Sequence, residues 1–261
     1  MRELTQDEIK KIELDILIEL DGLCRTHHIN YSITYGTLIG AIRHKGFIPW
    51  DDDIDVMMTR DDYEKFLSVW RDGKYKLFTL KKGMDFWPLF SRISDPRTTL
   101  EPPRICNHGI WVAVIPYDKI PTDEEEHLKH LKKVKRYLKL LEIKRFKMSK
   151  DDPRSWYRQI IVKLVQILLS PVSFYHIGKK AEALKTKYRN TNSKVLNPWI
   201  DPIFADADIF KEYFDIEFDG VKVMAIKNYD KYLRDQYGDY MTPPPVNDRV
   251  CPHTYTAYIN D

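Results

Sequence analysis

The sequence is poor in cysteine and has no long apolar run. Its 261 residues include three cysteines, Cys24, Cys106 and Cys251, and no two of them form a CxxC pair. This spacing argues against a disulfide framework and predicts reduced thiols in a cytoplasmic protein. No stretch reaches the roughly 18 apolar residues of a membrane-spanning helix. The polar start MRELTQDEIKK does not resemble a signal peptide.

Charge of one sign is also scarce. The formal net charge is +3, with 42 Lys and Arg against 39 Asp and Glu. This balance gives no support to nucleic-acid binding, and neither does any basic-aromatic pattern. Internal repeats are absent as well. The hydrophobic content of 43% is enough for a core, so we expect one large domain or one domain with a subdomain.

The order of the predicted elements is that of an α+β protein. Thr5 and Glu8 form a capping box at the start of a first helix, in which apolar residues recur at helical spacing up to Leu23. Alternating apolar residues predict strands at 31–35, 53–58, 75–80, 87–93 and 109–117, and a turn at Asp219-Gly220 predicts a hairpin over 213–226. Further helices are predicted at 38–44, 60–71, 122–150, 156–169, 176–190 and 228–236, before an extended proline-rich tail.

The composition becomes strongly basic after residue 121. We predict a catalytic core formed by residues 1–121 and 205–261, with a basic, amphipathic helical insertion at residues 122–204. The insertion is rich in Lys and Arg at first and apolar over 156–169. This pattern is typical of helices that lie on an anionic membrane surface. It is equally typical of a helical subdomain with a solvated basic face and a buried apolar face, so both interpretations stay open.

Residues 49–56, PWDDDIDV, place four aspartates within five positions and thread apolar residues through the end of the run. On a strand, Asp53 and Asp55 share one face, while Ile54 and Val56 face the core. Two carboxylates about 4 Å apart repel each other by roughly 4 kcal/mol near a protein surface. A hard divalent cation such as Mg²⁺ removes this penalty. The alternative for such a pair is a solvated acidic turn.

The residues before this strand favour a metal and phosphate site. A strand that ends at residue 35 is followed by Gly36 and Thr37 at a turn and then by a short helix. Backbone amides and the Thr37 hydroxyl would then lie where a phosphate chain meets the metal.

Residues 35–66, YGTLIGAIRHKGFIPWDDDIDVMMTRDDYEKF, resemble the signature of the LicD family of phosphotransferases, which is related to the fukutin proteins. GIWVAVIPYDKIP at 109–121 and YLRDQYGDYMTPPP at 232–245 extend the resemblance over nearly the whole chain. It implies a nucleotidyltransferase-like fold around a small mixed sheet. It also implies transfer of a phosphorylated alcohol, usually phosphocholine, from a CDP-linked donor to a sugar hydroxyl, with release of CMP.

The resemblance also implies roles for single residues. Asp53 and Asp55 match the metal pair, with Asp51 as an additional ligand, and Gly36 and Thr37 match the glycine turn beside the donor phosphates.

Further side chains are candidates for donor contacts. Arg43, after the short helix, and Arg92, on a strand expected near the site, are predicted to bind the donor phosphates. Arg249 and His253 either close over the site or pack at the surface. Three tryptophan rings could bind a quaternary ammonium through cation–π attraction, although most tryptophans simply pack in a core: Trp50, Trp87 and Trp111.

One position departs from the family pattern. Family members commonly read VDIFPLD where this sequence has VAVIPYD at 112–118, so the first aspartate is Ala113. That carboxylate is the natural general base for the attacking hydroxyl. Asp118 is a substitute if a turn at Pro116 redirects it, because on a continuous strand it faces the side opposite to Ala113. Otherwise the acceptor is activated differently or the protein is impaired.

The sequence thus predicts a Mg²⁺-dependent phosphotransferase, with Mn²⁺ as an alternative metal and Asp53, Asp55 and Asp118 as catalytic residues. The predicted donor is CDP-choline or another CDP-alcohol, and the predicted acceptor is a glycan or lipid-linked sugar of a surface precursor such as lipopolysaccharide or teichoic acid. The predicted location is cytoplasmic, with peripheral contact to the inner face of the cell membrane. Two alternatives stay open: a nucleotidyltransferase acting on a small acceptor, and a catalytically impaired homologue.

Overall fold

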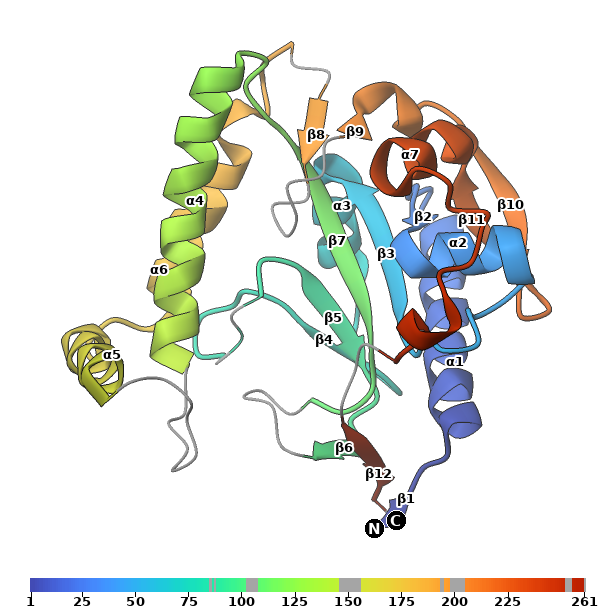
Figure 1. Ribbon diagram of the computed structural model, residues 1–261, viewed down its shortest axis with the longest axis horizontal. Coiled ribbons are helices and arrows are strands. Elements are labelled where there is room, and N and C mark those ends of the chain that lie inside the picture. The colour runs from blue at the N-terminus through green and yellow to red at the C-terminus, as the bar shows by residue number, and fades with distance from the viewer. Residues whose placement is uncertain are drawn as a thin grey trace.

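The computed structural model describes residues 1–84, 86, 88–101, 108–145, 156–192, 195–197, 205–251 and 255–260. Its helices are α1 (Gln6–Thr26), α2 (Tyr35–His44), α3 (Arg60–Val69), α4 (Glu124–Arg145), α5 (Trp156–Leu169), α6 (Phe174–Lys185) and α7 (Tyr229–Tyr237). Its strands are β1 (Arg2–Glu3), β2 (Ser32–Ile33), β3 (Ile54–Thr59), β4 (Lys76–Phe78), β5 (Ser91–Ser94), β6 (Thr98–Glu101), β7 (Trp111–Lys119), β8 (Val195–Asn197), β9 (Ala205–Asp206), β10 (Tyr213–Phe218), β11 (Val221–Ile226) and β12 (Thr256–Ile259). Figure 1 shows their arrangement.

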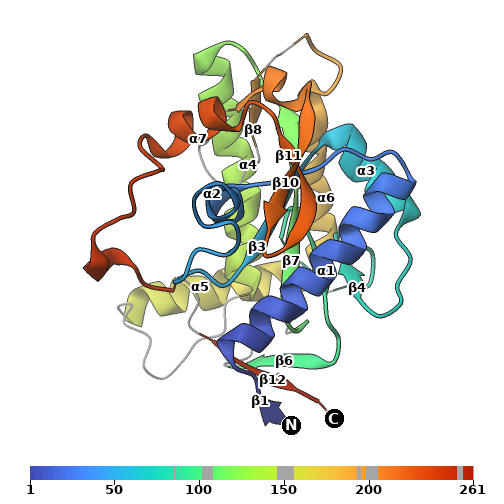
Figure 2. The same ribbon diagram turned by 90° about the vertical axis from the view of Figure 1, so that its right-hand side faces the viewer.

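The central feature is a mixed β-sheet in the order β2-β3-β7-β5-β4. β3 and β7 run parallel, and the other neighbouring pairs in this order run antiparallel. Beyond this order, β7 also pairs with β8, which pairs with β9. Figure 2 shows α1 running diagonally across the sheet. The expected α+β fold with a mixed sheet is therefore confirmed.

The first helix begins as its sequence predicts. The Thr5 hydroxyl accepts from the Glu8 amide at 3.3 Å, and the Glu8 carboxylate accepts from the Thr5 amide at 2.9 Å, which completes the capping box. One face of α1 is buried against the sheet, because Ile16, Leu17 and Leu20 belong to the main apolar core.

The entry into α2 differs from the sequence-based prediction. We expected a strand over 31–35 and then a Gly-Thr turn, but β2 ends at Ile33 and α2 already begins at Tyr35. Tyr35 has a left-handed backbone, with φ of 49°. This uncommon conformation turns the chain directly from strand to helix. Gly36 and Thr37 consequently lie in the first turn of α2.

The predicted hairpin is confirmed, and its tip packs against the site region. β10 and β11 pair around Asp219 and Gly220, which both have positive φ, as a two-residue turn of type I′ requires. The Asp219 amide donates to the Lys45 carbonyl at 2.8 Å. A Cβ atom on Gly46 would lie 2.1 Å from Asp219 Oδ1, so glycine here lets the hairpin tip approach this closely. The hairpin thereby supports the loop between α2 and β3.

Helices α4 and α6 pack beside the sheet around a second apolar cluster. Its buried members are Leu89, Ile120, Leu131, Val134, Leu141, Ile177 and Ala181. The predicted helices at 156–169 and 176–190 correspond to α5 and α6, and α4 ends at Arg145, with residues 146–150 outside the described part. β8 lies within the predicted insertion but pairs with β7. The division of the chain into a core and an insertion stays a prediction.

A second sheet joins the two ends of the chain. Its order is β1-β12-β6, which places the termini together at one edge of the molecule (Figure 1). We did not predict this sheet, because its strands are two to four residues long, too short for a periodic signal. The proline-rich tail before β12 is not extended throughout, since Val246–Asp248 forms a 3₁₀ turn.

Candidate active site

Three neighbouring strands carry the centre of the candidate site. In the sheet register, Asp55 on β3 lies opposite Ala113 on β7, and Ala113 lies opposite Arg92 on β5. Opposite residues on paired strands point to the same face, so these side chains form a row with Ala113 in the middle. The position that departs from the family pattern therefore separates a predicted metal ligand from a predicted phosphate-binding cation.

Thr37 ties α2 to the acidic strand. Its hydroxyl accepts from the Asp55 amide at 2.9 Å and donates to the Asp53 carbonyl at 3.4 Å. The side chain is buried, so these contacts are shielded from water. Thr37 lies at the site as predicted, but its hydroxyl holds the backbone that carries Asp53 and Asp55. Its contact with a donor stays a prediction.

Gly36 makes room for the Asp51 carboxylate. A Cβ atom at residue 36 would lie 2.3 Å from Asp51 Oδ2, and Asp51 Oδ1 accepts from the Asp52 amide at 3.3 Å. Asp51 consequently lies against the first turn of α2, the helix end where backbone amides favour negative charge.

A buried carboxyl on α1 extends the acidic group. Glu13 is 1% exposed, and its Oε2 atom has no hydrogen-bond partner. Burial raises the pKa of Glu13 well above its usual range, and the charges of Asp53, Asp52, Asp51 and Asp55 raise it further. The aspartate charges and burial thus favour the protonated, neutral form of Glu13 beside the site.

A basic-aromatic group lies beside the acidic loop, residues 49–53, which leads into β3. The guanidinium carbons of Arg43 and Arg249 lie 6.0 and 5.1 Å from the centroid of the Trp50 ring. Arg43 Nη1 donates to the Tyr240 carbonyl at 2.7 Å. Burial lowers the pKa of Arg43, and the charge of Arg249 lowers it further. The C-terminal tail therefore returns to the end of α2, while His253 lies outside the described residues.

Arg92 lies over an aromatic ring. Its guanidinium carbon is 4.1 Å from the Trp111 ring centroid. Burial lowers the pKa of the neighbouring His108 to about 4, with a contribution from Arg92, so this imidazole is neutral at pH 7. Trp50 and Trp111, two candidate faces for choline, thus both stack with arginine, and Trp87 lies outside the described residues.

Asp118 lies at the other end of the sheet. It follows Ala113 by five residues on β7, about 17 Å along a strand. Asp118 is buried, and Arg60 donates to its two carboxylate oxygens at 2.6 and 2.7 Å. Lys185 Nζ lies 3.9 Å from Oδ2. The structure does not bring Asp118 together with the two predicted metal ligands, and its carboxylate is held by a bidentate ion pair.

The metal ligands available here are carboxylates. Asp55 lies in β3 and Asp53 one residue before its start, and both are half-buried, so they are open to a ligand from outside. Within the described ranges, no group of three or more His, Cys, Asp or Glu side chains could hold a metal ion by itself. Binding of a metal by Asp51, Asp53 and Asp55 stays a prediction.

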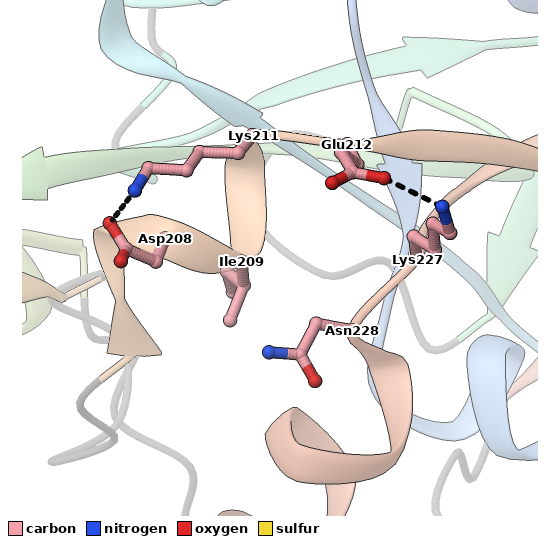
Figure 3. Close-up of a pocket in the computed structure, with 6 residues that line it drawn as sticks. All are labelled: Asp208, Ile209, Lys211, Glu212, Lys227 and Asn228. Atoms are coloured by element: carbon pink, nitrogen blue, oxygen red, sulfur yellow. Dashed lines mark hydrogen bonds and ion pairs between the residues drawn. The ribbon is translucent and has the colours of Figure 1, made fainter.

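A separate cavity of about 350 Å³ contains none of the predicted site residues (Figure 3). It lies between the start of β10 and the end of β11. Its lining charges pair with each other, Lys211 with Asp208 at 2.9 Å and Lys227 with Glu212 at 2.7 Å. The cavity therefore offers paired charges rather than a cluster aimed at a ligand.

Glu13 is the member of the site that our sequence analysis missed. It lies four residues after Ile9 and three before Ile16, which places a carboxyl within the apolar stripe of a helix. A charged residue at a core-facing position is unusual, and this signal was available in the sequence.

The mixed sheet, with Asp55 on β3 and Asp53 just before it, is the arrangement expected of a nucleotidyltransferase-like protein. In agreement, the family described as "LicD/FKTN/FKRP, nucleotidyltransferase domain" matches residues 28–95. The lipopolysaccharide cholinephosphotransferase LicD of Haemophilus influenzae is 32% identical over 272 residues, which cover 99% of this chain and 100% of that protein. The chain therefore belongs to the LicD family.

Two shorter similarities are to uncharacterized proteins. One is from Rickettsia prowazekii, with 32% identity over 23% of this chain and 26% of that protein. The other is from Rickettsia typhi, with 43% identity over 18% of this chain and 15% of that protein.

Replacing Gly36 with alanine should displace Asp51 without unfolding the protein. The new Cβ would overlap Asp51 Oδ2, a mobile side-chain end, whereas alanine favours a helix by up to about 1 kcal/mol over glycine. We expect unchanged or higher thermal stability and about tenfold weaker Mg²⁺ binding in isothermal titration. Gly22→Ala on α1 is the control, because its Cβ would meet no atom within 4 Å. Equal Mg²⁺ affinity in both variants would exclude Asp51 from the metal site.

Replacing Glu13 with glutamine should change how stability depends on pH. Since the pKa of Glu13 is raised in the folded chain, the unfolded chain loses this proton first as pH rises above about 4.5. The wild type therefore loses stability over that range, and the variant does not. In urea unfolding with chelator present, we expect Glu13→Gln to gain stability over the wild type from pH 4 to pH 7. The control is Glu19→Gln, an exposed position on the same helix, whose stability should differ from that of the wild type by the same amount at every pH. A pH-independent difference in stability for Glu13→Gln as well would contradict the raised pKa.

Proposed function

We propose that this protein transfers phosphocholine from a CDP-linked donor to a sugar hydroxyl of a cell-surface glycan precursor and releases CMP. The observation that carries the proposal is the 32% identity, over 99% of this chain, with a lipopolysaccharide cholinephosphotransferase. Membership of the LicD family supports a transferase. CDP-choline, rather than another CDP-alcohol, is the donor that this similarity favours.

Asp53 and Asp55 are the residues that we propose hold Mg²⁺, with Mn²⁺ as the alternative. They fit because they lie two residues apart at the entry to β3, close to other carboxyl groups, where a cation would offset their repulsion. When bound, the metal would neutralise the donor pyrophosphate and the charge that develops on CMP. Thr37 keeps the two carboxylates in place through its bonds to the backbone of both residues.

The arginines around this pair would bind the donor phosphates. Arg43 and Arg249 both approach Trp50, and burial followed by the charge of Arg249 lowers the pKa of Arg43, so an anion beside them would offset this repulsion. Arg92 projects from the same face of the sheet as Asp55, one strand beyond Ala113. These arginines would hold the donor phosphates near Asp53 and Asp55 while the acceptor hydroxyl attacks phosphorus in line.

The group that accepts the proton of the attacking hydroxyl is not Asp118 in this arrangement, because Arg60 and Lys185 hold it at the other end of β7. We propose instead that proton acceptance falls to a carboxylate of the acidic loop or to water. Transfer of a nucleotidyl group to a small acceptor is the second candidate, and the nucleotidyltransferase domain match favours it.

Titration with CDP-choline tests the donor. We expect binding that needs Mg²⁺, is reversed by chelator and leads to CMP release. Asp55→Asn should lower CMP release at least about a thousandfold, since metal contacts supply several kcal/mol. Asp61→Asn is the control, because Asp61 is exposed on α3. A cytidylylated acceptor would favour the second candidate, and failure of both CDP-choline and CDP to bind would exclude a CDP-linked donor.

Replacing Ala113 with aspartate tests whether the protein lacks a base. The new carboxylate would lie between Asp55 and Arg92, where family members carry one. If the missing base limits turnover, kcat for CMP release should rise about tenfold or more, with CDP-choline affinity nearly unchanged. Ala113→Asn, of similar size without charge, should give no gain. An unchanged or lower kcat for the aspartate variant would show that an absent base is not the limitation.

A further inference from the structure

Helix α5 turns its apolar side chains away from the protein. Six large ones are exposed: Tyr157, Ile160, Ile161, Leu164, Ile167 and Leu168. The contact with the body is in part polar, because the Gln166 amide donates to the Ile143 carbonyl on α4 at 2.8 Å. A surface helix normally has the opposite orientation, with its apolar side against the core. Figure 1 shows α5 at the edge of the molecule, next to the lower ends of α4 and α6.

The exposed apolar side chains form one continuous face. With about 100° between successive residues, they span an arc of about 120° around the helix axis. Lys163 lies beyond one edge of this arc and Arg158 beyond the other, and α5 contains no acidic residue. Gln159 and Gln166 project from the opposite side. An apolar face with a cation at each edge is the pattern of a helix that lies in a lipid–water interface.

Positive charge is concentrated on the neighbouring helix. Residues 129–145 of α4 include eight Lys or Arg and one Glu, although the formal net charge of the whole chain is only +3. Exposed members of this group are Lys132, Lys133, Lys135, Arg136 and Lys139. Such a concentration attracts an anionic bilayer surface.

The apolar surface continues from the end of α5 into the protein. A cavity of about 480 Å³ lies between α4, α6 and the turn that joins α5 to α6. Leu140, Leu169 and Val172 contribute apolar atoms to it, and Lys180 adds a cation. Lipid chains at the height of α5 would therefore meet an apolar recess with a positive charge beside it.

The geometry favours a helix in the membrane plane over a helix that crosses the membrane. Among the described residues, no single helix is long and apolar enough to cross a membrane. Tyr157–Leu169 and Phe174–Tyr188 together have the length and composition of a membrane span, but the chain bends by 92° between them. α6 is not available to lipid along its length, because it buries Ile177, Gly178, Ala181 and Lys185. α5 alone is about 21 Å long, shorter than the roughly 30 Å of a hydrocarbon core.

We propose that α5 docks this protein on an anionic membrane, with its apolar face among the acyl chains and Arg158 and Lys163 at the lipid phosphates. A second copy of the chain fits this face less well, because a two-fold contact would set the same cations of both copies against each other. Docking goes beyond the proposed function: it depends on neither the donor nor the metal, and it would bring the site to acceptors carried on lipid.

Sedimentation with vesicles tests the proposal. We expect the full chain to bind vesicles of phosphatidylcholine mixed equally with phosphatidylglycerol, and to bind phosphatidylcholine alone at least about tenfold more weakly. The variant Ile161→Ser, Leu164→Ser, Leu168→Ser should bind the mixed vesicles at least about tenfold more weakly than the wild type. The matched control is Ile18→Ser, Leu128→Ser, Val246→Ser, which removes three exposed apolar side chains elsewhere and should bind as the wild type does. All substituted residues are exposed, so circular dichroism should show folded protein in each case.

Three results would overturn the proposal. They are absence of binding to the mixed vesicles, equal binding by the α5 variant, and equal binding to both kinds of vesicle. A wild-type dimer in analytical ultracentrifugation that the α5 variant converts to a monomer, with unchanged vesicle binding, would assign this face to a second copy instead. Each readout is independent of CDP-choline turnover, so failure of the docking and failure of the proposed function are distinguishable.

Discussion

The parallel pairing of β3 with β7 is the constraint on which the rest of the structure depends. It sets Asp55 opposite Ala113, and the antiparallel strand β5 then sets Arg92 on the other side of Ala113. Parallel neighbours need a long connection, which here contains α3, β4, β5 and β6, and they need a buried environment. The same pairing carries Asp118 to the far end of β7, where a buried arginine neutralises it.

Charge is distributed unevenly over a chain that is nearly neutral as a whole. At the site, Asp51, Asp53 and Asp55 lie near a buried glutamate, and Arg43 lies near Arg249. The three aspartates and the two arginines each place like charges together, which costs stability in the free protein, and the ligand proposed above, a cation with phosphates, would relieve both. The basic helix α4 lies in the helical group outside this site, so the surface that we propose for a membrane is separate from the one that we propose for the donor.

Long periodic elements were predictable, and short or strained ones were not. The capping box of α1, the acidic strand and the Asp219-Gly220 hairpin depend on residues close in sequence, and the structure confirms them. The start of α2 was predicted wrongly, because a left-handed tyrosine replaces the expected turn. The sheet of β1, β12 and β6 was missed because its short strands are held by partners far along the chain.

The sequence by itself determined which side chains share a face and which family the chain resembles, because alternation along a strand and spacing along a helix are local properties. Only the tertiary structure decided what stands next to what. It placed Ala113 between Asp55 and Arg92, set Glu13 beneath a loop some forty residues away, and left the apolar face of α5 outside. Register and packing are non-local, and the periodicity of α5 would have suited a buried helix equally well.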